Sequence, residues 1–212
     1  MTIVETAPKQ GRLARASAVL IAVIAVLVAL DDLVHGITVS TGRVLIALGG
    51  AEGRLPLSAL PQLLQADLRE GTTGYLTDAP WGLRLLAASP AAIHAVTVLW
   101  AALVLTGILR YIAGAKPFEA PAISGWRHLA FILVIGGALQ GLADTFAVFE
   151  IAHLSTESMF TGKHLLGADY SGIGVNIPQW PILLIVLGIV AGSIAAAFRA
   201  GARLQEEALG VV

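Results

Sequence analysis

The chain has 212 residues, of which 57% are hydrophobic and 13% charged, and its mean hydropathy is +0.82. Soluble domains carry about a quarter charged residues, so this composition predicts an integral membrane protein. A formal net charge of -1 without a basic run argues against direct nucleic-acid binding, and the absence of cysteine excludes disulfides, thiol redox chemistry and thiolate metal sites.

The first predicted span is built on an uncharged stretch, residues 16–30, that ends abruptly in Asp31 and Asp32. At about 1.5 Å per helical residue this stretch covers about 22 Å, less than the roughly 30 Å of a bilayer's hydrocarbon core. The span is therefore predicted to include both acids and to cover residues 15–38. Because Asp-Asp-Leu-Val-His follows instead of a small-residue cleavage site, a retained span is favoured over a signal peptide.

The connection over residues 39–89 is rich in Gly and Pro and balanced in charge, which is typical of a water-facing segment. Residues 43–48 contain β-formers and end in a glycine-rich turn signal, which predicts a short strand. Residues 58–70 have leucines at helical spacing, which predicts an amphipathic helix. A connection of this length is too long for a linker without structure of its own, so it is predicted to fold as a cap over one membrane face.

Three further spans are predicted from apolar stretches of bilayer length. They cover residues 90–112, 128–150 and 179–198, and a second Gly-rich, polar outer loop over residues 155–177 separates the last two. The sequence thus predicts an all-α membrane protein with a single domain over residues 1–212, a four-helix transmembrane bundle with an extracytoplasmic cap.

Basic residues near the helix ends predict the orientation, because cytoplasmic loops of membrane proteins are enriched in Lys and Arg. The side that holds the termini carries Lys9, Arg12, Arg15, Arg110, Lys116, Arg127, Arg199 and Arg203. The other side carries five basic residues, spread over much longer loops. Both termini are therefore predicted to be cytoplasmic, in a multi-pass protein of the plasma membrane.

Glycine pairs predict close packing between the third and fourth spans. Gly137 and Gly141 lie four residues apart in the third span, as do Gly188 and Gly192 in the fourth, and this spacing lets helix backbones approach. Two alternatives stay open: glycine is simply frequent in membrane helices, or the fourth span forms a homo-oligomer.

Two motifs, KPFEAPAISGWRHLA (residues 116–130) and FRAGARLQEE (residues 198–207), resemble those of the four-span YoaS-like bacterial membrane proteins catalogued as DUF2975. The matching positions are Pro117, Phe118, Arg127, Phe198, Gly201, Leu204, Glu206 and Glu207. The resemblance implies a four-span plasma-membrane protein that has no established catalytic residues and is often encoded beside a small helix-turn-helix regulator.

Ionisable residues form a predicted polar layer near the outer ends of the spans: Asp31, Asp32 and His35 in the first, His94 in the second and Asp144 in the third. Asp31 and Asp32 lie four and three residues before His35, so at least one carboxylate shares a helix face with the imidazole. Ionisable groups at membrane depth cost about 2.5 to 3.5 kcal/mol each, so they tend to face the bundle interior and to pair.

Three interpretations of this layer stay open. In the first, the Asp and His side chains hydrogen-bond one another and anchor the cap. In the second, the layer is a proton site or binds zinc or another divalent ion, because imidazoles and carboxylates are suitable ligands. In the third, a b-type haem is held by His35 and His94, the one histidine pair at similar depth on two spans.

No catalytic or nucleotide-binding motif occurs in its required structural context, and four spans without an inverted repeat give little support for transport. The sequence therefore predicts a non-enzymatic accessory or signalling protein of the lipid bilayer with a cytoplasmic partner; the alternative is a metal-binding or proton-responsive protein. The candidate contact is the tail, with Arg203, Leu204, Glu206 and Glu207. It is either a solvated helix end or a docking segment for a basic partner such as a helix-turn-helix regulator.

Overall fold

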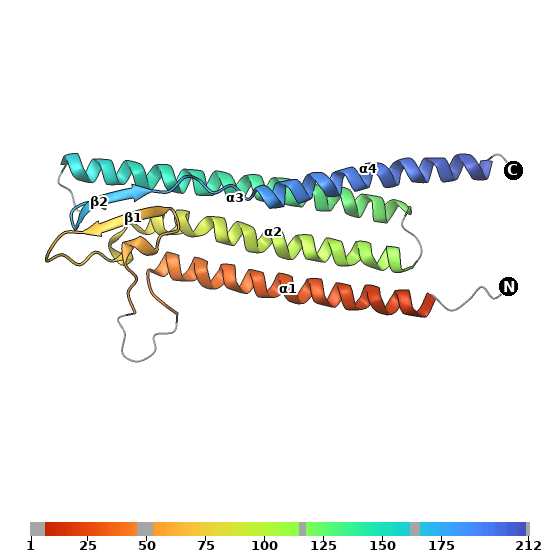
Figure 1. Cartoon of the computed structure of the whole chain (residues 1–212), viewed down its shortest axis with the longest axis horizontal. Helices are drawn as coiled ribbons and strands as arrows, with labels where there is room; N and C mark the ends of the chain where they lie inside the picture. The colour runs from red at the N-terminus through yellow and green to blue at the C-terminus, as the bar shows by residue number, and fades with distance from the viewer. Residues whose placement is uncertain (1–6, 46–52, 115–117, 162–165, 211–212) are drawn as a thin grey trace. The chain divides into compact units, whose positions relative to one another are not determined.

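The computed structural model describes residues 7–45, 53–114, 118–161 and 166–210 and is mostly helical (Figure 1). The long helices are α1 (Ala7–Thr41), α2 (Trp81–Ala113), α3 (Ala120–Thr161) and α4 (Ile182–Gly210). The connections hold the strands β1 (Leu63–Leu68) and β2 (Tyr170–Val175) and the single-turn 3₁₀ helices η1 (Leu57–Ala59) and η2 (Leu76–Asp78).

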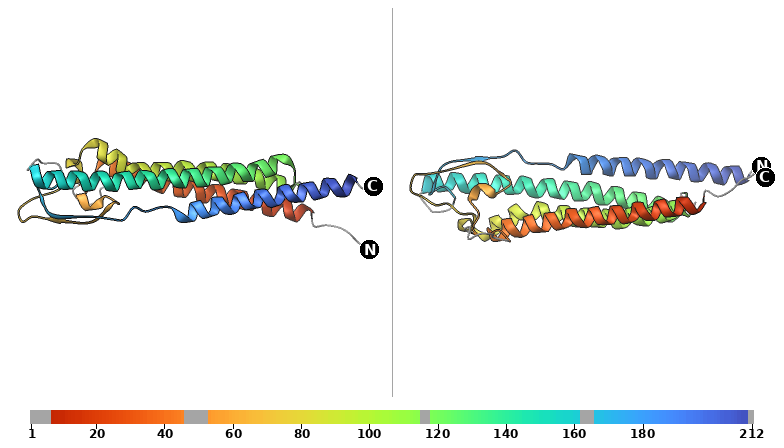
Figure 2. Two further views of the ribbon diagram at one scale, coloured as in Figure 1. Left: turned by 90° about the horizontal axis from the view of Figure 1, so that it is seen from above. Right: turned by 60° about the horizontal axis from the view of Figure 1, so that its bottom comes forward.

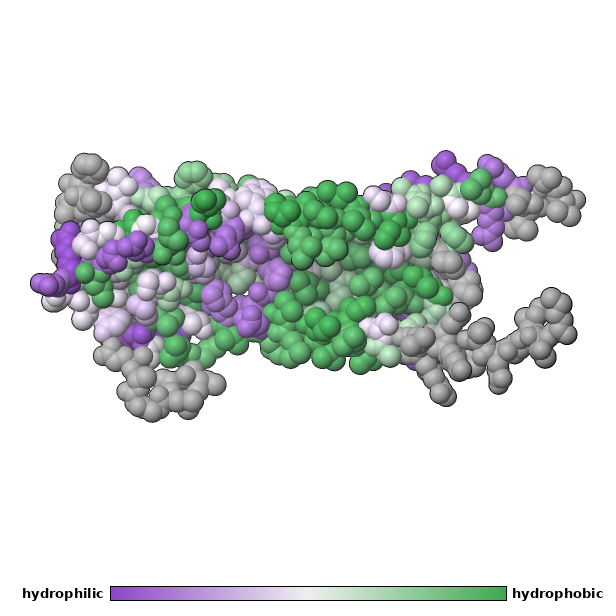
Figure 3. All heavy atoms as spheres, viewed as in Figure 1, coloured by the Kyte–Doolittle hydropathy of each residue, from purple (hydrophilic) through white to green (hydrophobic). Residues whose placement is uncertain are grey.

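All four long helices are apolar and long enough to cross a membrane, which confirms the predicted four membrane helices. Many of their large apolar side chains are exposed; Leu103 and Leu183, for example, are 72% and 73% exposed. Figure 3 shows hydrophobic side chains gathered over the helices, and hydrophilic ones over the loops that carry the strands and over the C-terminal end of α4. Apolar helix faces of this extent are suited to lipid rather than water, so the architecture is that of a multi-pass membrane protein.

The chain forms two compact units, each with its own core. The first unit contains Met1–Ala29, Ala95–Gly137 and Ile182–Val212, and the second contains Leu30–His94 and Ala138–Pro181. In the first unit, α2, α3 and α4 share a core that includes Ala101, Ile108, Leu129, Leu133 and Ala191. In the second, fully buried side chains from α1, α3 and the long loops form the core, among them Val39, Leu57, Leu60, Leu76 and Ile151.

Helices α3 and α4 approach closely in the first unit, as the glycine spacing in the fourth span predicts. A Cβ atom on Gly188 would lie 2.7 Å from Val134 Cγ2, 3.0 Å from the Val134 backbone nitrogen and 3.1 Å from the Ala130 carbonyl oxygen. A Cβ atom on Gly192 would lie 3.6 Å from Ala130 Cβ, an ordinary van der Waals contact. Only glycine fits the first position without moving the α3 backbone.

Replacing Gly188 with Ala is expected to lower the free energy of unfolding by about 1–3 kcal/mol, because the added methyl group overlaps backbone atoms that cannot rotate away. Gly192→Ala on the same helix face is the matched control and should melt like the unmodified protein. Thermal unfolding of both variants in detergent tests the difference, and equal melting temperatures would contradict this packing.

The predicted amphipathic helix over residues 58–70 is wrong. The segment contains part of η1 and strand β1, which pairs antiparallel with β2 from the second long loop, with Leu63 opposite Val175 and Leu68 opposite Tyr170. Pro61 has no N–H for a helix interior, and pairing with β2 outweighs the weak propensity of a short helix. Figures 1 and 2 show the two strands side by side, next to the C-terminal part of α3.

The predicted strand over residues 43–48 lies partly outside the described residues, which end at residue 45 on this side of the gap. Among the residues that are described, Arg43 forms an isolated antiparallel bridge with Arg54. The loop therefore folds back on itself directly after α1.

Helix α2 begins at Trp81 rather than near residue 90, and Pro90 lies within it. Proline cannot donate a hydrogen bond to the carbonyl oxygen four residues earlier, here that of Leu86. The Ser89 hydroxyl donates to this oxygen instead, at 2.7 Å. A neighbouring side chain thus satisfies the acceptor that Pro90 leaves free, and the helix continues without a break.

Candidate functional site

Helices α1 and α2 bring Asp32 and His94 of the predicted polar layer into direct contact. Nδ1 of His94 lies 2.7 Å from Oδ2 of Asp32, and the two side chains are 26% and 17% exposed, respectively. The imidazole N–H can donate to the carboxylate, and protonation of the ring converts this hydrogen bond into an ion pair. The pair therefore ties the second half of α1 to α2.

Asp31 and His35 lie on the exposed surface of α1, and within the described residues neither side chain forms a hydrogen bond or ion pair. Nor do the described residues contain a group of three or more His, Asp and Glu side chains placed to hold a metal ion. The contact between Asp32 and His94 fits the interpretation in which layer residues pair with one another. The metal site, with Asp144 as a further ligand, and the haem site stay predictions.

Asp144 lies in a different polar cluster. It is 8% exposed, and its carboxylate accepts two hydrogen bonds, from Gln62 Nε2 at 2.9 Å and from the backbone N–H of Gln179 at 2.6 Å. Gln62 Nε2 also donates to the Ala87 carbonyl oxygen at 3.3 Å, and the backbone carbonyl oxygen of Gln62 accepts from the Asn176 N–H at 2.8 Å. The buried Asp144 carboxylate thus links α3 to both long loops, with an N–H donor at each of its oxygens, and Gln62 connects this cluster to α2.

Gln62 is the residue of this cluster that the sequence analysis missed. It is buried, although glutamine is a polar residue that is mostly exposed in proteins. The only local signal is its position among leucines directly after Pro61, and this pattern does not identify a partner.

The C-terminal end of α1 is closed by a basic side chain from α2. Arg84 Nη1 donates to the carbonyl oxygens of Ser40, at 3.2 Å, and Thr41, at 3.1 Å. Gly42 then ends the helix with a φ of 68°, a left-handed conformation that favours glycine. The positive charge of Arg84 also complements the negative end of the helix dipole.

The two motifs that carry the family resemblance meet in the first unit. The Phe118 and Phe198 rings pack edge to face with centroids 5.6 Å apart, and the Trp126 and Phe198 rings do so at 6.3 Å. A Cβ atom on Gly201 would lie 2.9 Å from Phe118 Cε1, so the small residue makes room for the ring. Pro117 lies outside the described residues. We call Phe118, Trp126, Phe198 and Gly201 the aromatic cluster. Their contacts fix the base of the α4 tail.

Beyond the aromatic cluster, α4 continues as a helix to Gly210. Four residues of this tail, predicted as a partner contact, are exposed: Arg203, Leu204, Glu206 and Glu207. The structure therefore presents them together on an accessible helical segment.

Replacing Asp32 or His94 with Ala is expected to lower the free energy of unfolding by about 1–3 kcal/mol, because each change leaves the other polar group without its partner. The double replacement should cost little more than either single one, since both remove the same hydrogen bond. Thermal unfolding in detergent measures the three values.

Asp31→Ala and His35→Ala are the matched controls and should leave the melting temperature nearly unchanged. Bound zinc in the unmodified protein that is lost in His35→Ala would contradict simple pairing and favour the metal interpretation.

No protein-family model, curated protein or solved structure matches this chain. The resemblance of residues 116–130 and 198–207 to the DUF2975 proteins stays a prediction.

Proposed function

We propose that the chain is a plasma-membrane protein with both termini in the cytoplasm, and that it acts as a non-enzymatic accessory or signalling protein. Four helices of membrane length support the multi-pass architecture. The clustering of Lys and Arg near the ends of the predicted spans supports the orientation. In this orientation the paired strands β1 and β2 belong to an extracytoplasmic cap.

The observation that carries the proposal is the exposed helical tail of α4. Its base is held by the aromatic cluster, and its exposed part combines the apolar side chain of Leu204 with the carboxylates of Glu206 and Glu207. A preformed helix lowers the entropy cost of binding, and two adjacent carboxylates complement a basic surface. A cytoplasmic partner with a basic surface, such as a helix-turn-helix regulator, fits this segment.

Reporter fusions test the orientation. A reporter that is active only in the cytoplasm should be active when fused after Val212, and inactive when inserted at Gly71 in the first long loop. Activity at Gly71, or its absence after Val212, would reject the proposed orientation.

Charge reversal tests the docking segment. Replacing both Glu206 and Glu207 with Lys should strongly reduce co-purification of the cytoplasmic partner, whereas replacing both with Asp keeps the charge and should preserve it. Both variants should insert into the membrane normally, because the two positions lie beyond the predicted span over residues 179–198, at the polar end of α4. Unchanged partner recovery after deletion of residues 204–212 would eliminate the tail as the contact.

A second candidate is a metal-binding or proton-responsive protein that acts through the polar layer. The contact of 2.7 Å between Asp32 and His94 favours it, because an imidazole beside a carboxylate is suited to hold a proton or a metal ion. Metal analysis of the purified protein, together with melting at several pH values, separates this candidate from the first. A metal-free protein whose stability does not depend on pH would exclude it.

A further inference from the structure

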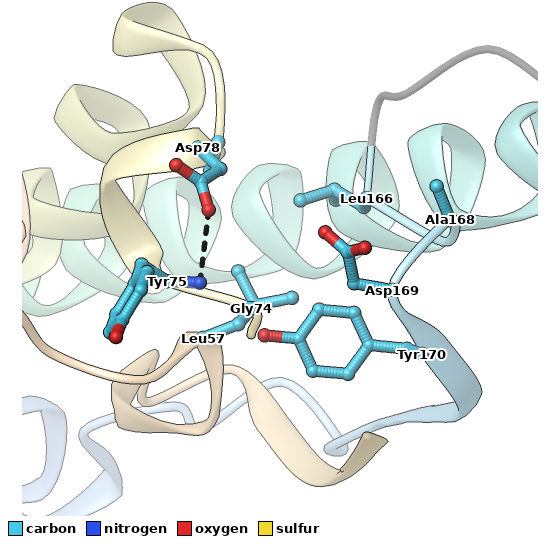
Figure 4. A pocket seen from close by; sticks show the side chains of 9 residues that line it. Leu57, Gly74, Tyr75, Asp78, Leu166, Ala168, Asp169 and Tyr170 are labelled. Atoms are coloured by element: carbon cyan, nitrogen blue, oxygen red, sulfur yellow. Dashed lines mark hydrogen bonds between the residues drawn. The ribbon is translucent and has the colours of Figure 1, made fainter. Parts of the chain in front are cut away.

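The two long loops line a small, partly open cavity of about 60 Å³ in the second unit (Figure 4). Its lining includes Leu57, Gly74, Tyr75, Asp78, Asp169 and Tyr170. A single water needs about 10–15 Å³ of such volume, so the cavity has room for an ion with part of its hydration shell. It lies apart from the predicted polar layer, whose residues do not line it.

Two carboxylates from different loops line this cavity, and none of its lining residues is basic. Asp78 accepts hydrogen bonds from the Tyr75 N–H at 3.1 Å and from the Thr77 hydroxyl at 3.4 Å. The Asp169 carboxylate forms no hydrogen bond or ion pair within the described part of the chain, although its backbone oxygen accepts from the Arg69 N–H at 2.9 Å. The negative charge at the cavity is therefore only partly compensated.

Tyr170 provides an independent sign of a missing ligand. The residue is 7% exposed, and its buried hydroxyl has no hydrogen-bond partner among the described residues. In Figure 4 the hydroxyl points toward Gly74 and Leu57, and a Cβ atom on Gly74 would overlap it. Burial raises the pKa of the Tyr170 phenol; the Leu57 backbone, which lies near the hydroxyl without meeting hydrogen-bond geometry, opposes this shift, and the negative charges of Asp169 and Asp78 add to it. A neutral, buried hydroxyl without a partner costs free energy unless a molecule in the cavity satisfies it.

We propose that this cavity binds a hydrated divalent cation, Ca²⁺ or Mg²⁺, between the carboxylates of Asp78 and Asp169. Both ions prefer oxygen ligands, and Mg²⁺ in particular is held by one or two carboxylates while it keeps several waters. A cation-bound water donates a hydrogen bond to the Tyr170 hydroxyl oxygen. Because the two carboxylates belong to different loops, the bound ion links the segment around η2 to the start of β2.

The test uses the full-length protein in detergent after treatment with EDTA, titrated with CaCl₂ or MgCl₂ at constant ionic strength. Calorimetry should show one saturable site for at least one of the two ions. The melting temperature should rise by about 5 °C or more at a hundredfold excess over Kd, because the ion binds only the folded state. Asp169→Asn should lose both effects, and Tyr170→Phe should weaken binding severalfold without unfolding the protein.

Asp67→Asn is the matched control, because Asp67 is an exposed carboxylate on β1 that does not line the cavity. It should bind the ion like the unmodified protein. The proposal is overturned if the unmodified protein binds neither ion, if Asp169→Asn binds unchanged, or if binding is lost in Asp32→Ala but kept in Asp169→Asn. The first of these outcomes is decisive even if Asp169→Asn fails to fold.

Discussion

Asp144→Ala is expected to lower the free energy of unfolding by about 2–4 kcal/mol, because it leaves the buried Gln62 amide and the part-buried Gln179 N–H without their acceptor. Gln62 Nε2 keeps only the longer bond to the Ala87 carbonyl oxygen, at 3.3 Å, and the Gln179 N–H loses a bond of 2.6 Å. Thermal or chemical unfolding in detergent, followed by circular dichroism, gives the value.

Asp144→Asn should cost about half as much, because its amide keeps one acceptor oxygen and turns the other position into a donor. Asp31→Ala provides the control, since Asp31 is exposed on α1. A variant at Asp144 that melts like the one at Asp31 would show that the buried hydrogen bonds contribute nothing to stability.

Ile151→Ala is expected to destabilise the protein by about 2–5 kcal/mol, because it opens a cavity in a core that the two long loops share with α3. Ile151 is 0% exposed and belongs to the same cluster as Leu57, Leu76 and Tyr170. Besides unfolding, limited proteolysis of the loops is a direct measurement, since loss of this side chain weakens their attachment to the helix.

The neighbouring Phe149→Ala is the matched control on the same helix. Phe149 is 67% exposed, so its removal should change the free energy of unfolding by less than about 0.5 kcal/mol. Equal losses from the two variants would mean that the loops do not pack on this face of α3.

The four membrane helices could be predicted from the sequence because uninterrupted apolar stretches carry their own signal. The residues at which the helices begin have a weaker sequence signal. Proline at residue 90 suggests a helix start, but α2 runs through it from Trp81, and the Ser89 hydroxyl donates to the Leu86 carbonyl oxygen that Pro90 leaves free. Strand β1 was missed for a related reason: its partner β2 lies in another loop, and strand pairing between distant segments leaves little trace in local spacing.

The polar layer was predicted only from the depth of its residues in the membrane. Depth gives the position of a residue along its helix, but not the direction in which its side chain points. It placed Asp32 and His94 at similar levels, and the structure joins them. It also placed Asp144 there, but the direction in which a side chain points around its helix depends on packing, and Asp144 is directed to Gln62 and Gln179. A glutamine in a loop has no spacing rule that would have indicated this contact.

The hydrogen bonds of the second unit also impose an order on folding during protein synthesis. Residue Leu63 pairs with Val175, and Asp144 receives its bond from Gln179, so neither interaction can form before the ribosome has passed these late positions. Roughly 100 residues lie between the two strands. At a synthesis rate of about 5–20 residues per second, β2 therefore leaves the ribosome about 5–20 s after β1. During this interval the edge of β1 is open to incorrect pairing, and the insertion of the third span has to precede the closure of the first loop. A nascent chain arrested before residue 170 would hold three membrane helices and a first loop that cannot yet adopt its final structure.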